Sequence, residues 1–202
     1  VQVTASWVSE TPDGQAAHLV MIVEDITERK ALEAQLVHRS LHDPLTGLPN
    51  RLLFQDRLWH ALERGRRENT PTCVLITDLD GFKAVNDELG HPMGDLVLVT
   101  FAERLRAVLR ASDTAARLGG DEFSIVCENT HRVDAEVLAE RLRASVMQPL
   151  LLSGTTVTIG LSIGIGSVAG GMEPGDVYEQ VAREADDAMY ADKARRRRGA
   201  RR

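Results

Sequence analysis

Two glycines and two carboxylates stand between two apolar runs in the stretch Arg117-Leu-Gly-Gly-Asp-Glu-Phe-Ser-Ile-Val126. Apolar runs of this length are typical of β-strands, and paired glycines supply the positive φ angles that a tight turn needs. The segment therefore predicts a β-hairpin with strands at 115–118 and 123–127, whose turn carries Asp121 and Glu122. Neither strand can bury these acids, and two carboxylates on a rigid turn can bind a hard cation through oxygen.

A second acidic block, Asp78-Leu-Asp-Gly-Phe-Lys-Ala-Val-Asn-Asp87, follows a continuous apolar run at 72–79. Such a run predicts a central strand with Asp78 at its end. Placed opposite Asp121 and Glu122, Asp78 would complete an oxygen cage for Mg²⁺, because carboxylates this close raise one another's pKa values unless a cation joins them. Taken alone, an Asp-x-Asp pair is equally well explained as the turn that ends a strand.

The rest of the second half alternates helices with strands. A loop rich in turn residues at 43–51 leads into a helix that ends near Arg66, and another strand is expected at 156–166. Strands covered by helices, with one antiparallel hairpin, predict an α/β fold, more specifically an α+β sandwich in which helices flank a central sheet. Apolar residues at helical spacing predict the remaining helices at 92–110, 132–147 and 175–198.

Residues 1–25 have a different pattern. Apolar and polar residues alternate on both sides of Pro12-Asp13-Gly14, which predicts two strands joined by a turn. Two strands alone are marginally stable in water, so they are expected to be the end of a truncated domain. The closing sequence Asp25-Ile-Thr-Glu-Arg-Lys30 resembles the end of a PAS sensor domain.

A helix is expected over 26–42, with Asp25 as its cap and Glu28 completing a capping box. This helix either packs on its own domain or forms a parallel coiled-coil signalling linker. Its position between two modules favours the linker. Its apolar stripe consists of Leu32, Leu36, Val37 and Leu41.

Composition narrows the class of protein. The chain has 202 residues, 43% of them hydrophobic, and a net charge of −6, which suits one globular domain with a small appendage. Apolar runs stay well short of 18 residues, so the sequence predicts no membrane-spanning segment. Because the chain starts at Val1, we interpret it as a fragment of a longer parent, whose own membrane association this sequence does not address. Cys73 and Cys127 lie in apolar runs and are expected to be buried free thiols.

Charge is unevenly distributed along the chain. Six arginines within 195–202 form a basic tail, so the remainder is strongly acidic. An acidic body argues against a broad nucleic-acid surface. Most of the tail is expected to be solvated and frayed.

Together the two acidic blocks and their flanks resemble the GGDEF domain of diguanylate cyclases over residues 43–198. The resemblance implies a fold like the palm of nucleotide polymerases and adenylate cyclases, with a central, mainly antiparallel sheet flanked by helices. It also implies that residues 43–202 form a catalytic domain that condenses two GTP into cyclic di-GMP and two pyrophosphates. The implied cofactor is Mg²⁺, with Mn²⁺ as an alternative, and the implied active form is a homodimer with its active sites facing the cytoplasm.

The same resemblance assigns the catalytic and phosphate-binding residues. Asp78, the main-chain carbonyl of Leu79, and Asp121 would bind the metal, and Glu122 would hold a second metal or help to deprotonate the attacking hydroxyl. Lys193 and Arg197, spaced i, i+4 on the last helix, would bind the triphosphate. Here Arg196-Arg197-Arg198-Gly199 replaces the family's usual Gly-Arg-Asn ending, so a neighbouring arginine is an alternative to Arg197. The turn expected to offer N–H groups to the β- and γ-phosphates is Gly81, Phe82 and Lys83.

Guanine recognition is assigned to Asn86 and Asp95. Guanine offers two N–H donors to a carboxylate, whereas adenine lacks that donor pair, so Asp95 favours GTP over ATP. Each residue also has a structural alternative: Asn86 as a helix cap, and Asp95 as an acid in a first helical turn. His91 is expected to hold its turn through hydrogen bonds.

Arg110-Ala-Ser-Asp113 ends five residues before the paired glycines. In the family, an Arg-x-x-Asp at this offset is an inhibitory site that binds the product. An arginine fork matches phosphate and guanine edges, and an aspartate pairs with guanine donors. The alternative is a helix-ending arginine beside a turn aspartate.

Two other functions compete with the cyclase. One is a catalytically silent module that binds GTP or cyclic di-GMP; loss of Asp78 or of an acid in the turn would favour it, and neither is lost. The other is a regulatory protein that passes a sensor signal to a separate output domain, such as a C-terminal phosphodiesterase in the parent.

Overall fold

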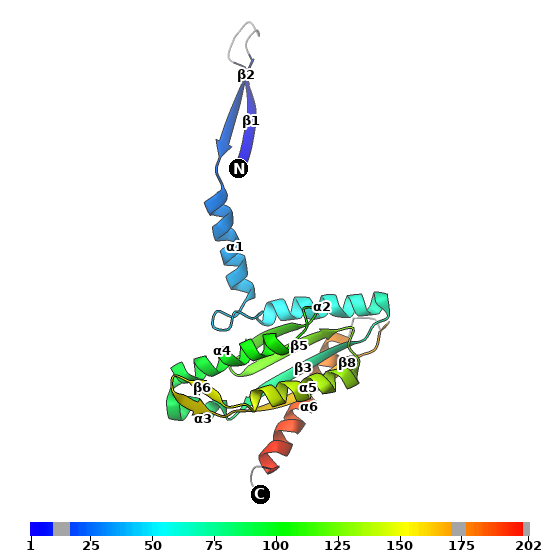
Figure 1. Cartoon of the computed structure of the whole chain (residues 1–202). Coiled ribbons are helices and arrows are strands. Elements are labelled where there is room, and N and C mark those ends of the chain that lie inside the picture. The colour runs from blue at the N-terminus through cyan, green and yellow to red at the C-terminus, as the bar shows by residue number, and fades with distance from the viewer. Residues whose placement is uncertain (10–16, 171–176, 200–202) are drawn as a thin grey trace. The chain divides into compact units, whose positions relative to one another are not determined.

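The computed structural model describes the backbone of residues 1–9, 17–170 and 177–199 (Figure 1). The chain divides into two compact units, Val1–Ser40 and Leu41–Arg202, which are described separately below. Among the described residues, no helix is both long enough and apolar enough to cross a membrane.

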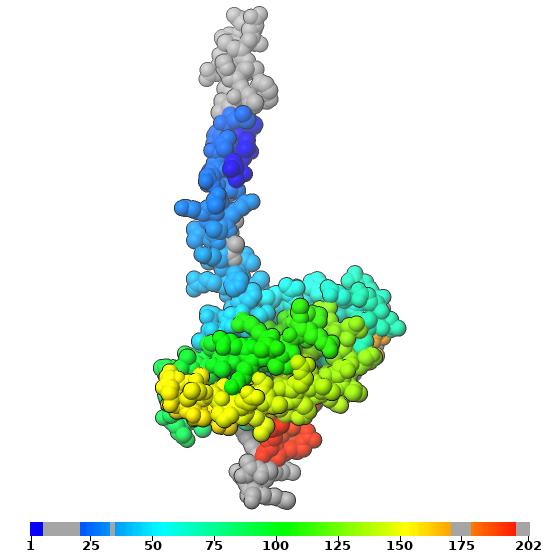
Figure 2. Space-filling view, viewed as in Figure 1, coloured from blue at the N-terminus to red at the C-terminus, as the bar shows by residue number. Residues whose placement is uncertain are grey.

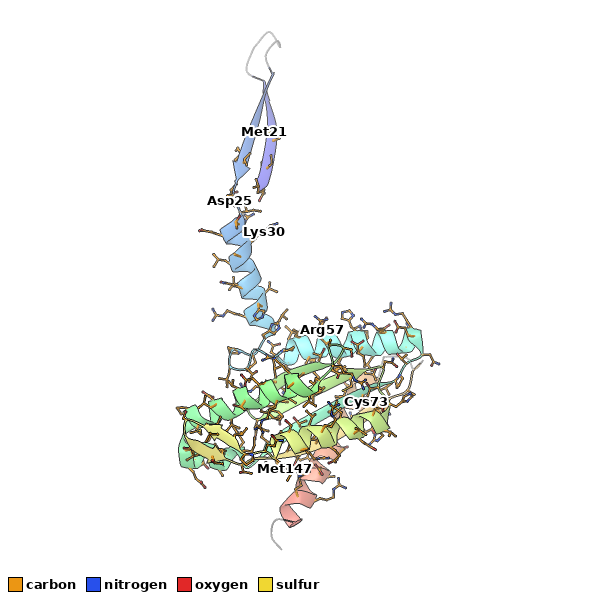
Figure 3. All side chains as sticks on the ribbon, viewed as in Figure 1. Met21, Asp25, Lys30, Arg57, Cys73 and Met147 are labelled. Carbon is orange, nitrogen blue, oxygen red and sulfur yellow. The ribbon has the colours of Figure 1, made fainter. Side chains whose placement is uncertain are left out.

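The first unit contains a hairpin and most of a helix. Strands β1 (Gln2–Ser9) and β2 (Ala17–Glu24) pair antiparallel, as predicted, and the expected turn at 12–14 lies outside the described residues. Helix α1 (Thr27–Leu41) begins two residues after Asp25 (Figure 3). The Asp25 carboxylate accepts hydrogen bonds from the Thr27 N–H at 2.9 Å and the Thr27 hydroxyl at 2.5 Å, which confirms Asp25 at the helix start. The Leu32, Leu36 and Val37 side chains are all more than half exposed.

The second unit is built on a four-stranded sheet in the order β4-β5-β3-β8. Every neighbouring pair is antiparallel, which confirms the expected sheet. The central strand β3 is almost entirely buried, because its continuous apolar run is covered on both faces. The strand bounds are β3 (Thr72–Asp80), β4 (Thr114–Gly119), β5 (Glu122–Glu128) and β8 (Gly160–Val168).

Helices cover both faces of this sheet and complete an α+β sandwich. Helices α4 (His91–Val108) and α5 (Arg132–Val146) cover one face, which Figures 1 and 2 present to the viewer, and share a core with Leu75, Phe123 and Ile165. Helices α2 (Arg51–Glu68) and α6 (Val177–Gly199) pack on the opposite face around Val74 and Val126.

Two glycines allow α6 to approach β8 closely. A Cβ atom on Gly164 would lie 1.8 Å from the Ala185 carbonyl oxygen, and one on Gly166 would lie 2.1 Å from the Val181 carbonyl oxygen. The contact is therefore backbone against backbone, and side chains on this strand face would push the helix away. This close packing fixes the distance between α6 and β8, and with it the position of the C-terminal part of α6 near the end of the sheet.

Carboxylates from α6 cover the outer edge of β8. The Asp192 carboxylate accepts the Ile163 N–H at 3.1 Å, and Glu184 accepts the Ser167 N–H at 3.2 Å. Both acids also pair with arginines of α5, Asp192 with Arg143 and Glu184 with Arg132. The ion pairs link helices α5 and α6, which cover opposite faces, around the edge of the sheet. The same carboxylates accept N–H groups that an edge strand would otherwise leave without a partner.

Three parts of the fold differ from the expectations. Phe82–Leu89 forms a short helix, α3, so Phe82 and Lys83 lie in a first helical turn and not in an open turn. Asn86 lies inside this helix, and Asp95 lies beyond the first turn of α4, so both structural alternatives to guanine binding are wrong. The strand expected at 156–166 is interrupted, because residues 155–157 pair with 150–152 in a separate hairpin, β6 (Leu150–Leu152) and β7 (Thr155–Val157).

The two cysteines face each other across the sheet. Cys73 and Cys127 are cross-strand partners on β3 and β5, both are buried, and both are free thiols, as expected. Burial raises the pKa of Cys73 to about 11 and also raises the pKa of Cys127. Neither thiol is therefore a reactive thiolate at neutral pH.

Candidate active site

The glycine turn holds its two acids differently. Gly119 and Gly120 have φ angles of 147° and 55°, so both require glycine-like freedom. Asp121 lies in the turn, whereas Glu122 is the first residue of β5 and pairs in register with Asp78 of β3. Directly opposed residues project from the same face of a sheet, so Asp78 and Glu122 share a face. Both turn acids are half-buried, which corrects the expectation that the hairpin leaves them outside.

Asp78 lies two residues before the end of β3 as an almost buried carboxylate, 7% exposed as a residue. Its Oδ1 atom accepts a hydrogen bond from Lys193 Nζ of α6 at 2.6 Å, across 115 positions of sequence. The close packing of α6 on β8 brings this lysine to the end of the central strand. Three of the predicted catalytic residues thus meet: Asp78 on β3, Glu122 opposite it on β5, and Lys193 on α6.

Asp121 lies near the same group. Burial and the negative charge of Asp78 raise the pKa of Asp121 above its ordinary value, although Lys193 and Arg117 act in the opposite direction. Two carboxylates near a single lysine leave excess negative charge in a partly desolvated place. The arrangement favours the approach of a further cation.

A cavity of about 560 Å³ opens beside these residues, a volume typical of small-molecule sites. The end of β3 and the start of α3 form one wall, and α6 forms another. Cationic side chains come from both walls. The cavity is lined by Leu79, Asp80, Gly81, Phe82, Lys83, Asp121, Gly160, Lys193 and Arg196.

Two lining residues, Asp80 and Gly160, were not assigned a role from the sequence. Ser162 of β8 donates its hydroxyl to both carboxylate oxygens of Asp80 at 2.9 Å, which fixes Asp80 at the cavity wall. A Cβ atom on Gly160 would lie 3.0 Å from the Asp80 Cβ, so the glycine leaves room for that side chain. Arg196 lines the cavity, whereas the Arg197 side chain lies outside the described part of the chain.

The two predicted guanine-binding residues lie together, but not in the cavity lining. Asn86 is on α3, and its Oδ1 atom lies against Gly94, the residue that precedes Asp95 on α4. A Cβ atom on Gly94 would lie 2.0 Å from that oxygen. Helix α3 thus holds the Asn86 amide against α4 at the residue before Asp95, whose side chain is exposed.

Arg110 and Asp113 form a separate group beyond the C-terminal end of α4. The Asp113 carboxylate accepts the Arg110 N–H at 3.0 Å. Both residues line a small cavity that Arg141 of α5 also lines. Neither residue lines the 560 Å³ cavity, so the predicted inhibitory residues and the predicted catalytic residues occupy different places.

Arg117 connects the glycine turn to the loop that precedes α2. Its guanidinium donates to the Gly120 carbonyl at 2.9 and 3.0 Å and to both oxygens of Asp43 at 3.1 Å. Asp43 also accepts the N–H and hydroxyl of Thr46 at 2.8 and 2.7 Å. Burial acts to raise the pKa of Asp43, but the Thr46 hydrogen bonds and the Arg117 charge outweigh it and leave the pKa below its ordinary value.

Arg117→Ala is expected to lower the free energy of unfolding at pH 7 by about 3 kcal/mol, because it leaves a half-buried carboxylate and the Gly120 carbonyl without their partner. A depressed folded-state pKa gives stability that is present above the unfolded pKa and is lost as pH falls through the folded value. The difference from wild type in urea unfolding should therefore shrink below about pH 4. An equal difference at pH 3 and pH 7 would contradict the role of the Asp43 charge.

The donor chemistry at the end of β3 fits a small hard cation. Among the described residues, no group of three or more His, Cys, Asp and Glu side chains is placed to hold a metal ion. Mg²⁺ commonly uses only one or two carboxylates, with substrate phosphates and water as its other ligands. Asp78 and Asp121, with the adjacent Leu79 carbonyl, offer that kind of set of oxygen ligands.

The fold is an α+β sandwich with an antiparallel sheet and a carboxylate–lysine group near the end of its central strand, and comparison with known proteins identifies its family. The family model described as "Diguanylate cyclase, GGDEF domain" matches residues 40–199. The chain therefore belongs to the GGDEF domain family of diguanylate cyclases.

Individual relatives agree with this assignment. The chain is similar to the bifunctional diguanylate cyclase/cyclic di-GMP phosphodiesterase MucR of Pseudomonas aeruginosa, at 47% identity over 82% of this chain and 24% of MucR. It is 44% identical to the diguanylate cyclase TpbB of the same organism, over 84% of this chain and 38% of TpbB. The chain thus spans well under half the length of these curated relatives.

Solved structures support the same fold. The GGDEF domain of TpbB from P. aeruginosa superposes with a TM-score of 0.71 at 42% identity, covering 76% of this chain and 89% of that one. The coiled coil and GGDEF domain of DgcB from Caulobacter crescentus, in complex with c-di-GMP, gives a TM-score of 0.74 at 30% identity, covering 83% and 87%.

Proposed function

We propose that this chain is a diguanylate cyclase that condenses two GTP molecules into cyclic di-GMP and two pyrophosphates. The observation that carries the proposal is the Asp78–Lys193 hydrogen bond beside Asp121, next to a cavity that Asp121, Lys193 and two further cationic side chains line. A triphosphate supplies the negative charge for those cations. The carboxylates face the position where a metal-bound phosphate would lie.

The reaction transfers a nucleotidyl group. The 3′-hydroxyl oxygen of one GTP attacks the α-phosphorus of the other, the bond from that phosphorus to the bridging oxygen breaks, and pyrophosphate leaves. Lys193 and Lys83 bind the phosphates, the first N–H groups of α3 approach their oxygens, and Glu122 accepts the hydroxyl proton. A second, symmetric transfer closes the ring. Catalysis then consists mainly of positioning and charge stabilisation.

Asp78 and Asp121 would hold Mg²⁺, with the Leu79 carbonyl as a further oxygen ligand and Mn²⁺ as an alternative ion. When bound, the ion neutralises phosphate charge and lowers the pKa of the attacking hydroxyl. Lys193 then exchanges part of its contact with Asp78 for a phosphate.

The proposed assembly is a homodimer, because one cavity of this size holds one nucleotide and the reaction needs two facing each other across a two-fold axis. Residues 26–42 are proposed to link the catalytic domain to a PAS-like sensor that ends at residues 1–25, in a protein whose catalytic domain faces the cytoplasm. Arg110 and Asp113 are proposed to bind the product away from the active site. Arg141 lines the same cavity and adds a second guanidinium.

Gly94→Ala tests the proposed reading of guanine by Asn86 and Asp95. The new methyl group would displace the Asn86 amide, so the KM for GTP is expected to rise about tenfold, equivalent to one lost hydrogen bond. A Cβ atom at this position would also lie 3.3 Å from Phe82 Cζ, so a small fall in melting temperature is expected and is measured beside KM. In an Asn86→Ala background, the Gly94→Ala change should add nothing, because the oxygen that it displaces is gone. Additive effects on KM would contradict the steric account.

The direct test of the cyclase is product formation from GTP and Mg²⁺, followed by chromatographic separation of the nucleotides. Wild type is expected to release two pyrophosphates for each cyclic di-GMP, to lose activity when the metal is chelated, and to leave ATP unchanged. A folded, dimeric wild type that forms no cyclic di-GMP would overturn the proposal and favour a ligand-binding module.

A further inference from the structure

Asp192 is a buried carboxylate on α6 that the proposed chemistry does not use. Its Oδ2 atom accepts the Ile163 N–H at 3.1 Å, an Arg143 amino group at 2.8 Å and Arg196 Nε at 3.2 Å. Burial acts to raise the pKa of Asp192, but the Ile163 hydrogen bond and the arginines outweigh it and keep the pKa below its ordinary value. A negative charge is thus fixed between a strand edge and two cations.

Arg143 holds this carboxylate from the other side of the sheet edge. The Arg143 side chain is 16% exposed and the Asp192 side chain 11% exposed, so the pair is shielded from water. Arg143 also pairs with Glu140 on its own helix at 2.5 Å. Because both partners are anchored, the pair differs from a mobile surface ion pair, which contributes little.

Arg196 is the residue that connects Asp192 to the cavity. Its Nε donates to Asp192, and the side chain lines the cavity together with Lys83 and Lys193. Its two terminal amino groups make no hydrogen bond or ion pair with the described residues. A guanidinium fixed through Nε can still present those amino groups to a phosphate as a planar fork.

The preceding arginine shows that this orientation is specific. Arg195 approaches Asp192 only at 3.6 Å, its side chain is 77% exposed, and it is absent from the described cavity lining. Two consecutive arginines on one helix therefore have different surroundings. Only Arg196 combines a buried anchor with a place at the cavity.

We propose that Asp192, anchored by Arg143 and the Ile163 N–H, is a positioning residue that aims the Arg196 guanidinium at the nucleotide triphosphate. The inference rests on the proposed function, because it takes GTP as the ligand. It gives Arg196 the contact that the family resemblance assigned to Arg197. The cationic wall of the cavity then consists of Lys193 and Arg196 on α6, opposite Lys83 on α3.

The first test compares Arg196→Ala with Arg195→Ala, which removes the same charge one residue away. Arg196→Ala is expected to raise the KM for GTP at least about tenfold, the loss of a charge-assisted hydrogen bond, with kcat within about threefold of wild type. Arg195→Ala should stay close to wild type in both parameters. Equal behaviour of the two variants would overturn the proposal.

The second test separates positioning by Asp192 from a purely structural role. Asp192→Asn keeps an oxygen for the Ile163 N–H but loses the charge that holds Arg196, so it is expected to raise KM in the same direction. Combined with Arg196→Ala, it should raise KM no further, because both changes remove one contact. Because Asp192→Asn also breaks the shielded pair with Arg143, stability is expected to fall in either case. A purely structural role would lower kcat in either background, and additive KM effects would contradict positioning.

Binding without turnover separates this inference from the cyclase proposal. Calorimetric titration with GTP and GMP, without Mg²⁺, should show weaker binding of GTP by Arg196→Ala and unchanged binding of GMP, which lacks the β- and γ-phosphates. If wild type binds GTP more tightly than Arg196→Ala does but forms no product, the cyclase proposal is refuted and the Arg196 contact is supported. An active wild type with no difference in GTP binding between the variants would refute the contact alone.

Discussion

Asp121→Asn is expected to lower the rate of cyclic di-GMP formation by about 10³-fold or more, because it removes a charged metal ligand from the centre of the site. The fold should survive. Burial and Asp78 raise the folded-state pKa of Asp121 above its unfolded value, so ionisation of this acid at neutral pH weakens the folded state. The uncharged amide should therefore leave the metal-free melting temperature unchanged or slightly higher.

Asp56→Asn is the matched control for this substitution. Asp56 is an exposed residue of α2 that forms only a 3.5 Å surface pair with His60. Its activity should stay within about twofold of wild type, as for surface changes in general. Near-normal turnover by Asp121→Asn would refute the metal site. A loss of activity accompanied by a lower melting temperature would indicate misfolding and refute the separation of catalysis from stability.

Gly164→Ala is expected to lower the free energy of unfolding by about 3 kcal/mol or more, because its methyl group would meet the Ala185 carbonyl and the Met189 N–H at 1.8 and 2.2 Å. Backbone atoms cannot rotate away, so α6 must shift as a whole. Activity should fall as well, since Lys193 and Arg196 move with the helix. Thermal and urea unfolding measure the first effect, and GTP turnover measures the second.

Gly154→Ala is the control that adds the same methyl group to a glycine with no close neighbours, so it separates steric crowding from backbone strain. Gly154 lies between β6 and β7 with a φ angle of 82°, and a Cβ atom there would meet nothing within 4 Å. Its alanine variant should lose about 1–2 kcal/mol through backbone strain alone and keep full activity. If Gly164→Ala cost no more than Gly154→Ala, close helix packing would not explain the glycine at position 164.

Patterns within single segments predicted most of the fold. The apolar run at 72–79 predicted β3, and the glycine pair predicted the β4–β5 hairpin. Helix α3 was missed because Asp80-Gly-Phe-Lys83 has the composition of a turn, and only the packing of Phe82 and Val85 in the core shows that the segment continues as a helix. The β6–β7 hairpin was missed because its short strands merge with the next apolar run in the sequence.

The candidate site was predicted where a motif carries it and missed where distant segments meet. Asp78, Asp121 and Lys193 were expected in one site, and the structure places them together. Asp192 carries no motif, and Arg196 could not be ranked above the other arginines of the basic tail. Their importance depends on the rotation of α6 against the edge of β8, which no local pattern encodes.

The covering of the sheet edges limits how two copies can associate. Carboxylates of α6 occupy N–H groups on the outer side of β8, and on the outer side of β4 the Arg117 N–H is bonded to the Pro49 carbonyl at 3.0 Å. Joining two sheets into one continuous sheet would break these bonds first. The proposed dimer must therefore meet through helices and loops. Such contacts can slide and rotate, so a signal from upstream can change the distance between two nucleotides without unfolding a strand.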